Sequence, residues 1–359
     1  MFSSKRLLGR RSYRYSVRFI CCSFFLTAAC LTLFSVIHFI YTAPGAANAY
    51  LYRLQIHMAM ANREAVIIHP VDVKNYIPSD FHVYKNETCP ERFPEMVGPV
   101  DVNMTEISLK QVESELKHPI TFGGSWKPDD CIPKWRVAFL IPFRNRHQHV
   151  PILLRHIFPH LFKQHVEFGI FVVNQEGDFP FNRAMLLNIG FVEIQKLKKD
   201  YYDCFIFHDV DHIPENDRIY YGCKDMPKHF AEQLDIHLYR LEYDDFFGGV
   251  SGVMTDQFEK VNGFCNQFWG WGGEDDDFYA RIKHHGYNIS RPPNNYGRYQ
   301  AIVKHHTQEA QFLGRFSLLH DSVERSKTDG LNSLVYSKPT ITYEPFFTNI
   351  SVMIKPPME

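Results

Sequence analysis

The stretch Phe207-His208-Asp209-Val210-Asp211-His212-Ile213-Pro214 decides the fold assignment of this chain. The largely apolar residues 203–206 before it predict a buried strand, which Pro214 would end. Asp209 and Asp211 would then lie at the carboxyl end of a strand, where α/β sheets place ligand chemistry. Residues two apart in an extended strand point the same way, so both carboxylates would face one centre unless the break at Pro214 splays them. Carboxylate oxygens suit Mg²⁺ or Mn²⁺, although acidic pairs at strand ends are more often solvated loop starts.

The residues before this stretch predict alternating strands and helices. Strands are expected at 136–142, 166–173 and 204–207, and helices at 149–163 and 183–195. Such alternation favours an α/β fold with a central mixed, mainly parallel sheet of the nucleotide-binding, Rossmann-like type. A fold of this kind does not fix the function by itself.

Composition places few limits on the function. The chain has 359 residues, 39 basic and 40 acidic side chains and 45% hydrophobic residues. This is enough for one large core, and no basic excess points to nucleic acid. Most of the 31 Phe and 19 Tyr residues are expected in the core, while a sugar-binding cleft could use some of them.

The N-terminal region predicts a membrane anchor. Residues 1–18 carry six cations and no acid, and residues 19–41 form a mostly apolar run. A run of about 23 residues can cross a hydrocarbon core, and the preceding cations favour a cytosolic N-terminus. A cleaved signal peptide is the alternative, because residues 43–47 offer a weak cleavage-like site. We expect a cytosolic tail (1–18), a signal-anchor (19–41), a stem (42–85) and a lumenal catalytic domain (86–359).

Sequons and cysteines fit a secretory lumen. Four Asn-x-Ser/Thr sequons are candidates for glycosylation: Asn86, Asn103, Asn288 and Asn349. The predicted lumenal body holds five cysteines: Cys89, Cys131, Cys204, Cys223 and Cys265. If four of them pair, one stays free, and the sequence alone leaves the connectivity open.

Two polar segments follow predicted strands or open predicted helices. Pro142-Phe143-Arg144-Asn145-Arg146 ends the first strand, where two guanidiniums and an amide could grip a diphosphate and a base edge. A basic surface turn is the plainer alternative. Phe181-Asn182-Arg183 opens a helix, where backbone N–H groups and a cation favour anions, although an ordinary helix cap would look the same.

The segment Phe268-Trp-Gly-Trp-Gly-Gly-Glu-Asp-Asp-Asp-Phe278 combines glycines, indoles and acids. The glycines permit close backbone approach and hinge motion, and an indole face can stack on a sugar ring. We expect a helix over 278–285, which four acids would open. Four acids that served only as caps would repel one another, so a carboxylate here could instead take a proton from a sugar hydroxyl. Further on, His305 and His306 offer imidazoles to a divalent metal, or are simply polar surface.

Together these motifs resemble the β-1,4-galactosyltransferase family, which are inverting glycosyltransferases of the GT-A fold. The resemblance runs from about Cys89 to about Val352 and rests most on Trp269-Gly-Trp-Gly-Gly-Glu-Asp-Asp-Asp277. Further matching motifs are Phe247-Gly-Gly-Val-Ser251, Asn262-Gly-Phe264 and Asp329-Gly-Leu-Asn-Ser-Leu334. The resemblance implies a single-pass type II enzyme of the Golgi membrane. The enzyme would use Mn²⁺ to transfer galactose from UDP-galactose to a terminal GlcNAc or Glc of a glycoprotein or glycolipid.

The resemblance also implies roles for individual residues. Asp211 would ligate Mn²⁺, Asp275 would be the general base beside Glu274, and Trp271 would lie on a mobile loop over the donor. The implied donor site consists of Pro142, Phe143, Arg144, Asn145, Arg146, Phe181, Arg183, Asp209, Val210, Asp211, Phe246 and Trp271. The implied acceptor site consists of Gly273, Glu274, Asp275, Asp276, Arg315, Phe316 and Leu319. The implied disulfides are Cys89–Cys131 and Cys204–Cys223, with Cys265 unpaired.

The chain departs from the family pattern in two places. The family's Met-x-x-His metal pair is not reproduced cleanly: Ala301 or Ile302 takes the place of Met, and we expect His305, or alternatively His306, as the imidazole ligand. Phe246 stands where other members have a Tyr whose hydroxyl meets the donor sugar. The subgroup that makes lactosylceramide shares Phe246, a His-rich run and Gln311-Phe-Leu-Gly314. Galactose is therefore the expected donor sugar, N-acetylgalactosamine is the alternative, and a non-catalytic lectin-like membrane protein is a third hypothesis.

Overall fold

The computed structural model describes residues 85–304 and 310–356. The predicted cytosolic tail and anchor, nearly all of the predicted stem, and both His305 and His306 lie outside the described residues. Among the described helices none has the length and apolar character needed to span a membrane.

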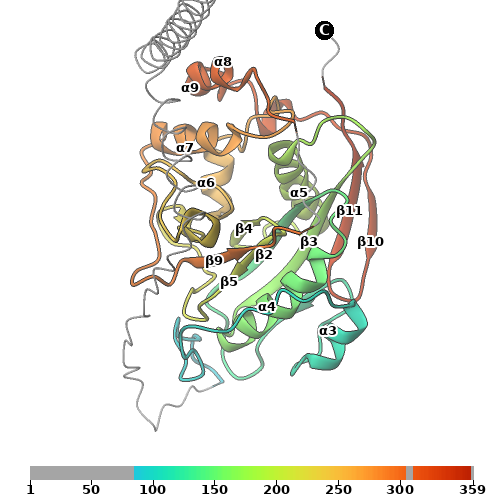
Figure 1. Cartoon of the computed structure of the whole chain (residues 1–359), viewed down its shortest axis with the longest axis vertical. Helices are drawn as coiled ribbons and strands as arrows, with labels where there is room; N and C mark the ends of the chain where they lie inside the picture. Colours follow the sequence, from blue (N-terminus) through green and yellow to red (C-terminus); the bar gives the residue numbers. More distant parts are fainter. Residues whose placement is uncertain (1–84, 305–309, 357–359) are drawn as a thin grey trace, which may run out of the picture. The chain divides into compact units, whose positions relative to one another are not determined.

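A mixed sheet forms the centre of the described domain (Figure 1). Its strand order is β10-β11-β3-β2-β4-β8-β6. Outside this order, β1 pairs with the first residues of β3. Three pairs, β11–β3, β3–β2 and β2–β4, are parallel, and four, β4–β8, β8–β6, β10–β11 and β1–β3, are antiparallel, so the sheet is mixed as predicted but not mainly parallel. The strands are β1 Ser125–Trp126, β2 Arg136–Phe143, β3 Glu167–Glu176, β4 Cys204–His208, β6 Lys228–His229, β8 Val250–Met254, β10 Thr340–Tyr343 and β11 Thr348–Met353.

A second, smaller sheet lies beyond the end of β4. It consists of β5 His212–Pro214, β9 Arg298–Ala301 and β7 Gln233–Leu234, in the order β5-β9-β7. The helices are α3 Leu109–Glu115, α4 His149–Lys163, α5 Arg183–Leu197, α6 Thr255–Lys260, α7 Glu274–His284, α8 Arg315–His320 and α9 Ser322–Arg325, with 3-10 turns η1 Asp235–His237 and η2 Leu331–Ser333.

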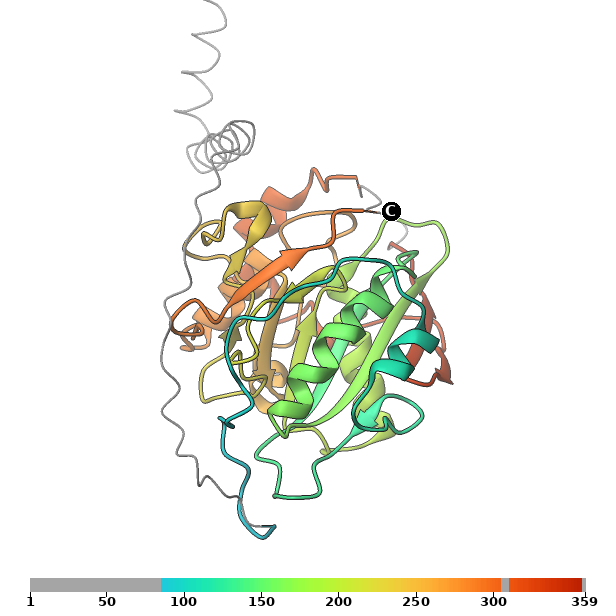
Figure 2. The same ribbon diagram turned by 60° about the horizontal axis from the view of Figure 1, so that its bottom comes forward.

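After Arg136 at its start, strand β2 is apolar, and both of its faces are buried. Val137, Phe139 and Ile141 pack into a core with α4, while Ala138 and Leu140 pack into a second core with α5. Figure 2 shows α4 lying along one face of the sheet. Parallel strands covered on both faces read as continuous hydrophobic runs, which is why this strand is visible in the sequence.

Most predicted elements are confirmed, with small shifts at their ends. Helix α4 has the predicted bounds, β2 and β4 are each one residue longer than predicted, β3 runs on to Glu176, and α5 runs on to Leu197.

Two boundary predictions are wrong. Strand β4 ends at His208, where its ladder with β8 also ends, so Pro214 does not stop it and instead lies in β5. Helix α7 begins at Glu274 rather than Phe278. Gly273 has a left-handed φ of 100° that ends the loop there, and the acids stand inside the first turn, where the helix dipole favours them.

The structure contains the Cys89–Cys131 and Cys204–Cys223 disulfides that the resemblance implies. Cys265 is an unpaired, buried thiol that donates to Asp329 Oδ2 at 2.8 Å. The sequon residues Asn86, Asn103 and Asn288 are exposed, whereas Asn349 is half-buried in β11.

Candidate active site

The two aspartates of the opening stretch lie in a turn between β4 and β5, not in an extended strand. Asp209 Oδ1 accepts from Arg183 Nε at 2.6 Å, while Asp211 Oδ2 accepts from Arg146 Nη1 at 2.8 Å. The turn therefore directs the two carboxylates to different cations. One donor atom each from Asp209, Asp211 and His212 still lies within 4.8 Å of the others. Two hard oxygens and an imidazole at this spacing suit a divalent metal.

Arg183 joins the strand-end turn to the acid run of α7. It is the first residue of α5, which Asn182 caps by accepting from the Met185 N–H at 2.8 Å. Its Nη1 lies 2.7 Å from Asp275 Oδ1 and 3.9 Å from Glu274 Oε1. Burial alone would lower the pKa of Arg183, but the surrounding carboxylates, led by Asp209, raise it. The guanidinium therefore remains a cation between the two acidic motifs.

The four acids of α7 point to different surroundings. Asp276 accepts from the Tyr243 hydroxyl at 2.5 Å. Asp277 is fully buried and accepts from Arg281 Nε at 2.6 Å and Arg325 Nη2 at 2.7 Å. Only Asp275 and Glu274 approach Arg183, so the predicted acceptor residues divide between the site and its supporting structure.

Burial sets the protonation of the two acids beside Arg183. Desolvation, aided by the neighbouring Asp275 charge, raises the pKa of Glu274 to about 8. Desolvation also raises the pKa of Asp275, to about 6. The Arg183 charge opposes this rise and limits it. Arg183 Nη1 lies 2.7 Å from Asp275 but 3.9 Å from Glu274, so the cation stabilises the ionised form of Asp275 more directly, and a carboxylate is the form able to accept a proton.

The segment after β2 supplies cations to the same place. Asn145 has a left-handed φ of 54°, which turns the chain so that Arg146 reaches Asp211. Arg144 lies over the Phe181 ring at 5.2 Å from its centroid. Pro142, Phe143 and Val210 are buried and carry no charge, so they can shape the site without holding phosphate.

The glycine-rich segments allow close approach of backbone to the site. A Cβ on Gly248 would lie 2.5 Å from Asp275 Oδ2, so a larger residue there would displace that carboxylate. Phe246, two residues earlier, packs edge-on against His229 and Tyr243, with ring centroids 5.3 and 5.4 Å away.

Trp271 is held on a glycine-flanked loop next to the predicted acceptor residues. Gly270 donates to the Phe181 carbonyl at 2.8 Å, and the Trp271 indole is 47% exposed. The Arg315 guanidinium lies 5.8 Å from the Trp271 ring and 5.0 Å from the Phe316 ring. Phe316 is exposed and Leu319 half-buried, so α8 offers apolar surface beside the loop.

Sequence reasoning missed two site residues. His212 Nδ1 lies 2.8 Å from Asp211 Oδ1, a contact that adjacency in the opening stretch could have suggested. Tyr243 bonds Asp276 from a loop that carries no motif, so no local signal pointed to it.

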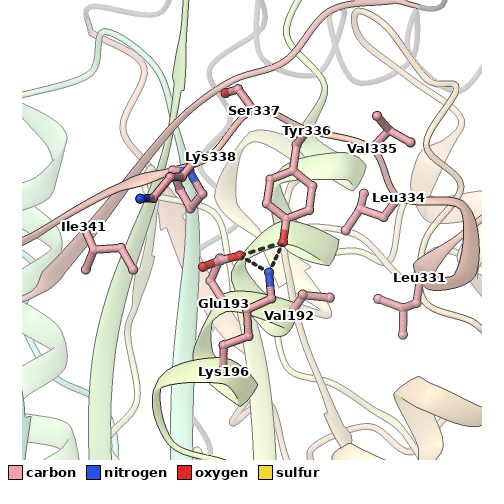
Figure 3. A pocket seen from close by; sticks show the side chains of 11 residues that line it. Val192, Glu193, Lys196, Leu331, Leu334, Val335, Tyr336, Ser337, Lys338 and Ile341 are labelled. Atoms are coloured by element: carbon pink, nitrogen blue, oxygen red, sulfur yellow. Dashed lines mark hydrogen bonds and ion pairs between the residues drawn. The ribbon is translucent and has the colours of Figure 1, made fainter.

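A groove of about 740 Å³ lies elsewhere, between α5 and the segment that leads to β10. Its polar centre is Glu193, Lys196 and Tyr336, which bond one another (Figure 3). None of its lining residues belongs to the predicted site, and the three polar side chains at its centre already hydrogen-bond one another.

Comparisons with known proteins agree with this geometry. The profile of the N-terminal region of glycosyl transferase group 7 matches residues 89–224, and that of the N-terminal domain of galactosyltransferase matches residues 228–306. The catalytic domain of Drosophila β1,4-galactosyltransferase 7, solved with xylobiose, is 30% identical with a TM-score of 0.53, covering 62% of this chain and 94% of that one. A variant of the same enzyme was solved with manganese, UDP-Gal and xylobiose at the same similarity. The described domain is thus a glycosyltransferase of the GT-A fold.

Relatives that match over nearly their whole length define the family within the glycosyltransferases. Pig β-1,4-galactosyltransferase 5 is 47% identical over 357 residues, covering 90% of this chain and 91% of the relative. Human β-1,4-galactosyltransferase 6 is 44% identical over 379 residues, covering 97% of each. The chain belongs to the β-1,4-galactosyltransferase family and is an enzyme of that family.

Proposed function

We propose that this enzyme transfers galactose from UDP-galactose, with inversion and with Mn²⁺, to the 4-hydroxyl of a terminal GlcNAc or Glc. The observation that carries the proposal is the position of Arg183, bonded on one side to Asp209 and on the other to Asp275. A donor diphosphate beside the strand-end turn and an acceptor hydroxyl beside Asp275 would then lie on either side of one guanidinium.

The donor end of the site would be formed by the strand-end turn and the segment after β2. Asp211, with Asp209 beside it, would hold the metal, while Arg144 and Arg146 would hold phosphate oxygens. When bound, Mn²⁺ supplies Lewis-acid neutralisation of the charge that develops on the leaving diphosphate. Arg146 already lies 2.8 Å from Asp211, so its guanidinium is placed to move onto a phosphate.

The acceptor end would rest on Asp275. Its carboxylate would accept the proton of the sugar 4-hydroxyl as that oxygen attacks the anomeric carbon from the face opposite the diphosphate. A single displacement of this kind converts an α-linked donor into a β-linked product. Trp271, on its glycine-flanked loop, would cover the donor and exclude water, which limits hydrolysis.

Two features favour a glycolipid acceptor within this reaction. Phe246 and the segment 311–314 resemble the lactosylceramide-forming subgroup, and Leu313 and Phe316 expose 88% and 60% of their surface near Trp271. We therefore propose glucosylceramide as an acceptor, with GlcNAc of a glycoprotein as the competing one. Transfer of N-acetylgalactosamine is the second candidate reaction, because Phe246 lacks the hydroxyl that would contact the donor sugar.

A competition assay tests these proposals together. The purified enzyme is given UDP-galactose and UDP-N-acetylgalactosamine with glucosylceramide or N-acetylglucosamine, each with Mn²⁺ and with EDTA. We expect galactose transfer that EDTA abolishes. Transfer of N-acetylgalactosamine in excess of galactose would replace the donor assignment. Binding of sugar without any transfer would favour a lectin-like role, against which the intact Asp209, Asp211 and Asp275 argue.

We further propose that residues 19–41 anchor the enzyme in the Golgi membrane with residues 86–359 in the lumen. Protease protection in sealed vesicles should spare the lumenal body and remove only the tail. N-terminal sequencing of the purified protein distinguishes an anchor, which keeps residue 1 or 2, from a cleaved signal peptide that would end near residue 47.

A further inference from the structure

His212 directly follows the turn that carries Asp209 and Asp211, and its side chain is largely buried. It is the first residue of β5, its side chain is 14% exposed, and its Nδ1 lies 2.8 Å from Asp211 Oδ1. Together with Asp209 it completes the group of donor atoms that lie within 4.8 Å of one another.

We propose that His212 ligates the divalent cation through Nδ1, next to Asp211, and does more than hydrogen-bond to that carboxylate. This inference rests on the proposed metal-dependent function. Donor atoms about 2.1 Å from one ion and at right angles to each other lie about 3 Å apart. The observed 2.8 Å between Asp211 Oδ1 and His212 Nδ1 fits two neighbouring ligands of one ion.

The backbone around His212 fixes which ring nitrogen faces Asp211. A Cβ on Gly249 would lie 2.9 Å from His212 Nε2, so the imidazole packs with that nitrogen against the glycine backbone. The opposite ring nitrogen, Nδ1, is then the one directed to the carboxylate. The Ile302 N–H donates to the Asp211 carbonyl at 2.8 Å and holds the turn beside β9.

The strand opposite His212 supplies no competing donor. His212 pairs with Ala301 across β5 and β9, and residues directly opposite in an antiparallel pair share a face. The Ala301 methyl cannot ligate a metal. Ala301 or Ile302 stands where the resemblance places a methionine ligand, so His212 offers a donor from the facing strand in its stead.

Ligation sets the proton position on the ring. Nδ1 must present its lone pair, so the remaining proton sits on Nε2 and the ring is neutral. The hydrogen bond to Asp211 is exchanged for shared coordination of the ion, and until a donor phosphate is bound Asp211 Oδ2 keeps its contact with Arg146.

Pulsed electron paramagnetic resonance of bound Mn²⁺ tests the proposal, because a ligating imidazole adds ¹⁴N modulation to the signal. The full chain in detergent is loaded with Mn²⁺, with and without UDP, in a background carrying His305→Ala and His306→Ala. We expect the ¹⁴N modulation to persist in this background and to vanish when His212→Leu is added. We also expect Mn²⁺ affinity to fall at least about tenfold with that change.

The controls separate ligation from other roles. His212→Gln keeps a polar side chain of similar reach, should also lose the modulation, and serves if the leucine variant does not fold. Unchanged ¹⁴N modulation in either folded variant, or its absence in the background protein, would overturn the proposal. Nitrogen-coordinated Mn²⁺ in the background protein, together with no sugar transfer by the unmodified enzyme, would instead contradict the proposed function and leave the His212 ligand in place.

Discussion

The two acidic motifs, Asp209-Val-Asp211 and Glu274–Asp277, differ in the backbone that carries them. In the first, a turn between two strands sends each carboxylate to its own arginine. In the second, successive residues of a helix are rotated by about 100°, so adjacent acids face different partners. Asp275 faces Arg183, while Asp277 faces Arg281 and Arg325 in the core. Neighbouring acids in a sequence therefore need not share a role. Substitution of Asp275 should affect catalysis, and substitution of Asp277 should affect stability.

The largest expected effect is on catalysis at the first of these two acids. Asp275→Asn keeps the shape and removes the proton acceptor, so we expect transfer to fall by about 10²- to 10⁴-fold. UDP binding should remain, since the residues proposed to hold UDP are unchanged. Steady-state kinetics and calorimetry with UDP provide the two readouts. Asp276→Asn is the matched control and should lose far less transfer activity. Turnover of Asp275→Asn at the rate of the unmodified enzyme would reject the base assignment.

The second prediction concerns stability at Asp277. Asp277→Asn leaves the buried guanidinium of Arg281 without its charged partner, which costs about 3–5 kcal/mol of unfolding free energy. Urea unfolding of the full chain in detergent should show a much lower midpoint than for Asp275→Asn. If Asp277→Asn lost transfer while its unfolding midpoint stayed the same, the division between a site acid and a structural acid would be wrong.

A pH profile sharpens the assignment of Asp275 over Glu274. The pKa of Asp275, raised by burial to about 6, means that the base is protonated as the pH falls through 6. We expect kcat/KM to decline by about tenfold for each pH unit below that point, because the protonated acid cannot accept a proton. If the base were Glu274, whose pKa burial and the neighbouring Asp275 charge also raise, the decline would begin at a higher pH.

The smallest effect is expected between the two motifs, at Phe246. Phe246→Tyr adds the hydroxyl that other family members place against the donor sugar, a hydrogen bond worth on the order of 1 kcal/mol. The preference for galactose over N-acetylgalactosamine should then rise by about fivefold in a donor competition assay. Tyr243→Phe, which removes a neighbouring hydroxyl bonded to Asp276 instead, is the comparison. An unchanged donor ratio in Phe246→Tyr would place the ring outside the donor-sugar site.

Local pattern was enough to predict much of the fold. The bounds of α4 and the course of β2 follow from apolar periodicity and from burial on two faces, which are properties of neighbouring residues. The start of α7 at Glu274 was missed because the preceding Gly273 has a left-handed φ that is not visible in a hydrophobic pattern. The end of β4 was missed because it depends on where its partner β8 ends.

The sequence by itself determined which side chains are candidates for the chemistry: the strand-end aspartates, the acid run, the glycine-flanked tryptophan and the arginines after β2. Only the tertiary structure decided which of them meet. Arg183 bonds partners 26 and 92 residues away, and Asp277 is drawn into the core while Asp275, two residues earlier, faces the site. The physical reason is that ion pairs of this kind depend on distances between side chains, and those distances are set when the sheet and its covering helices pack.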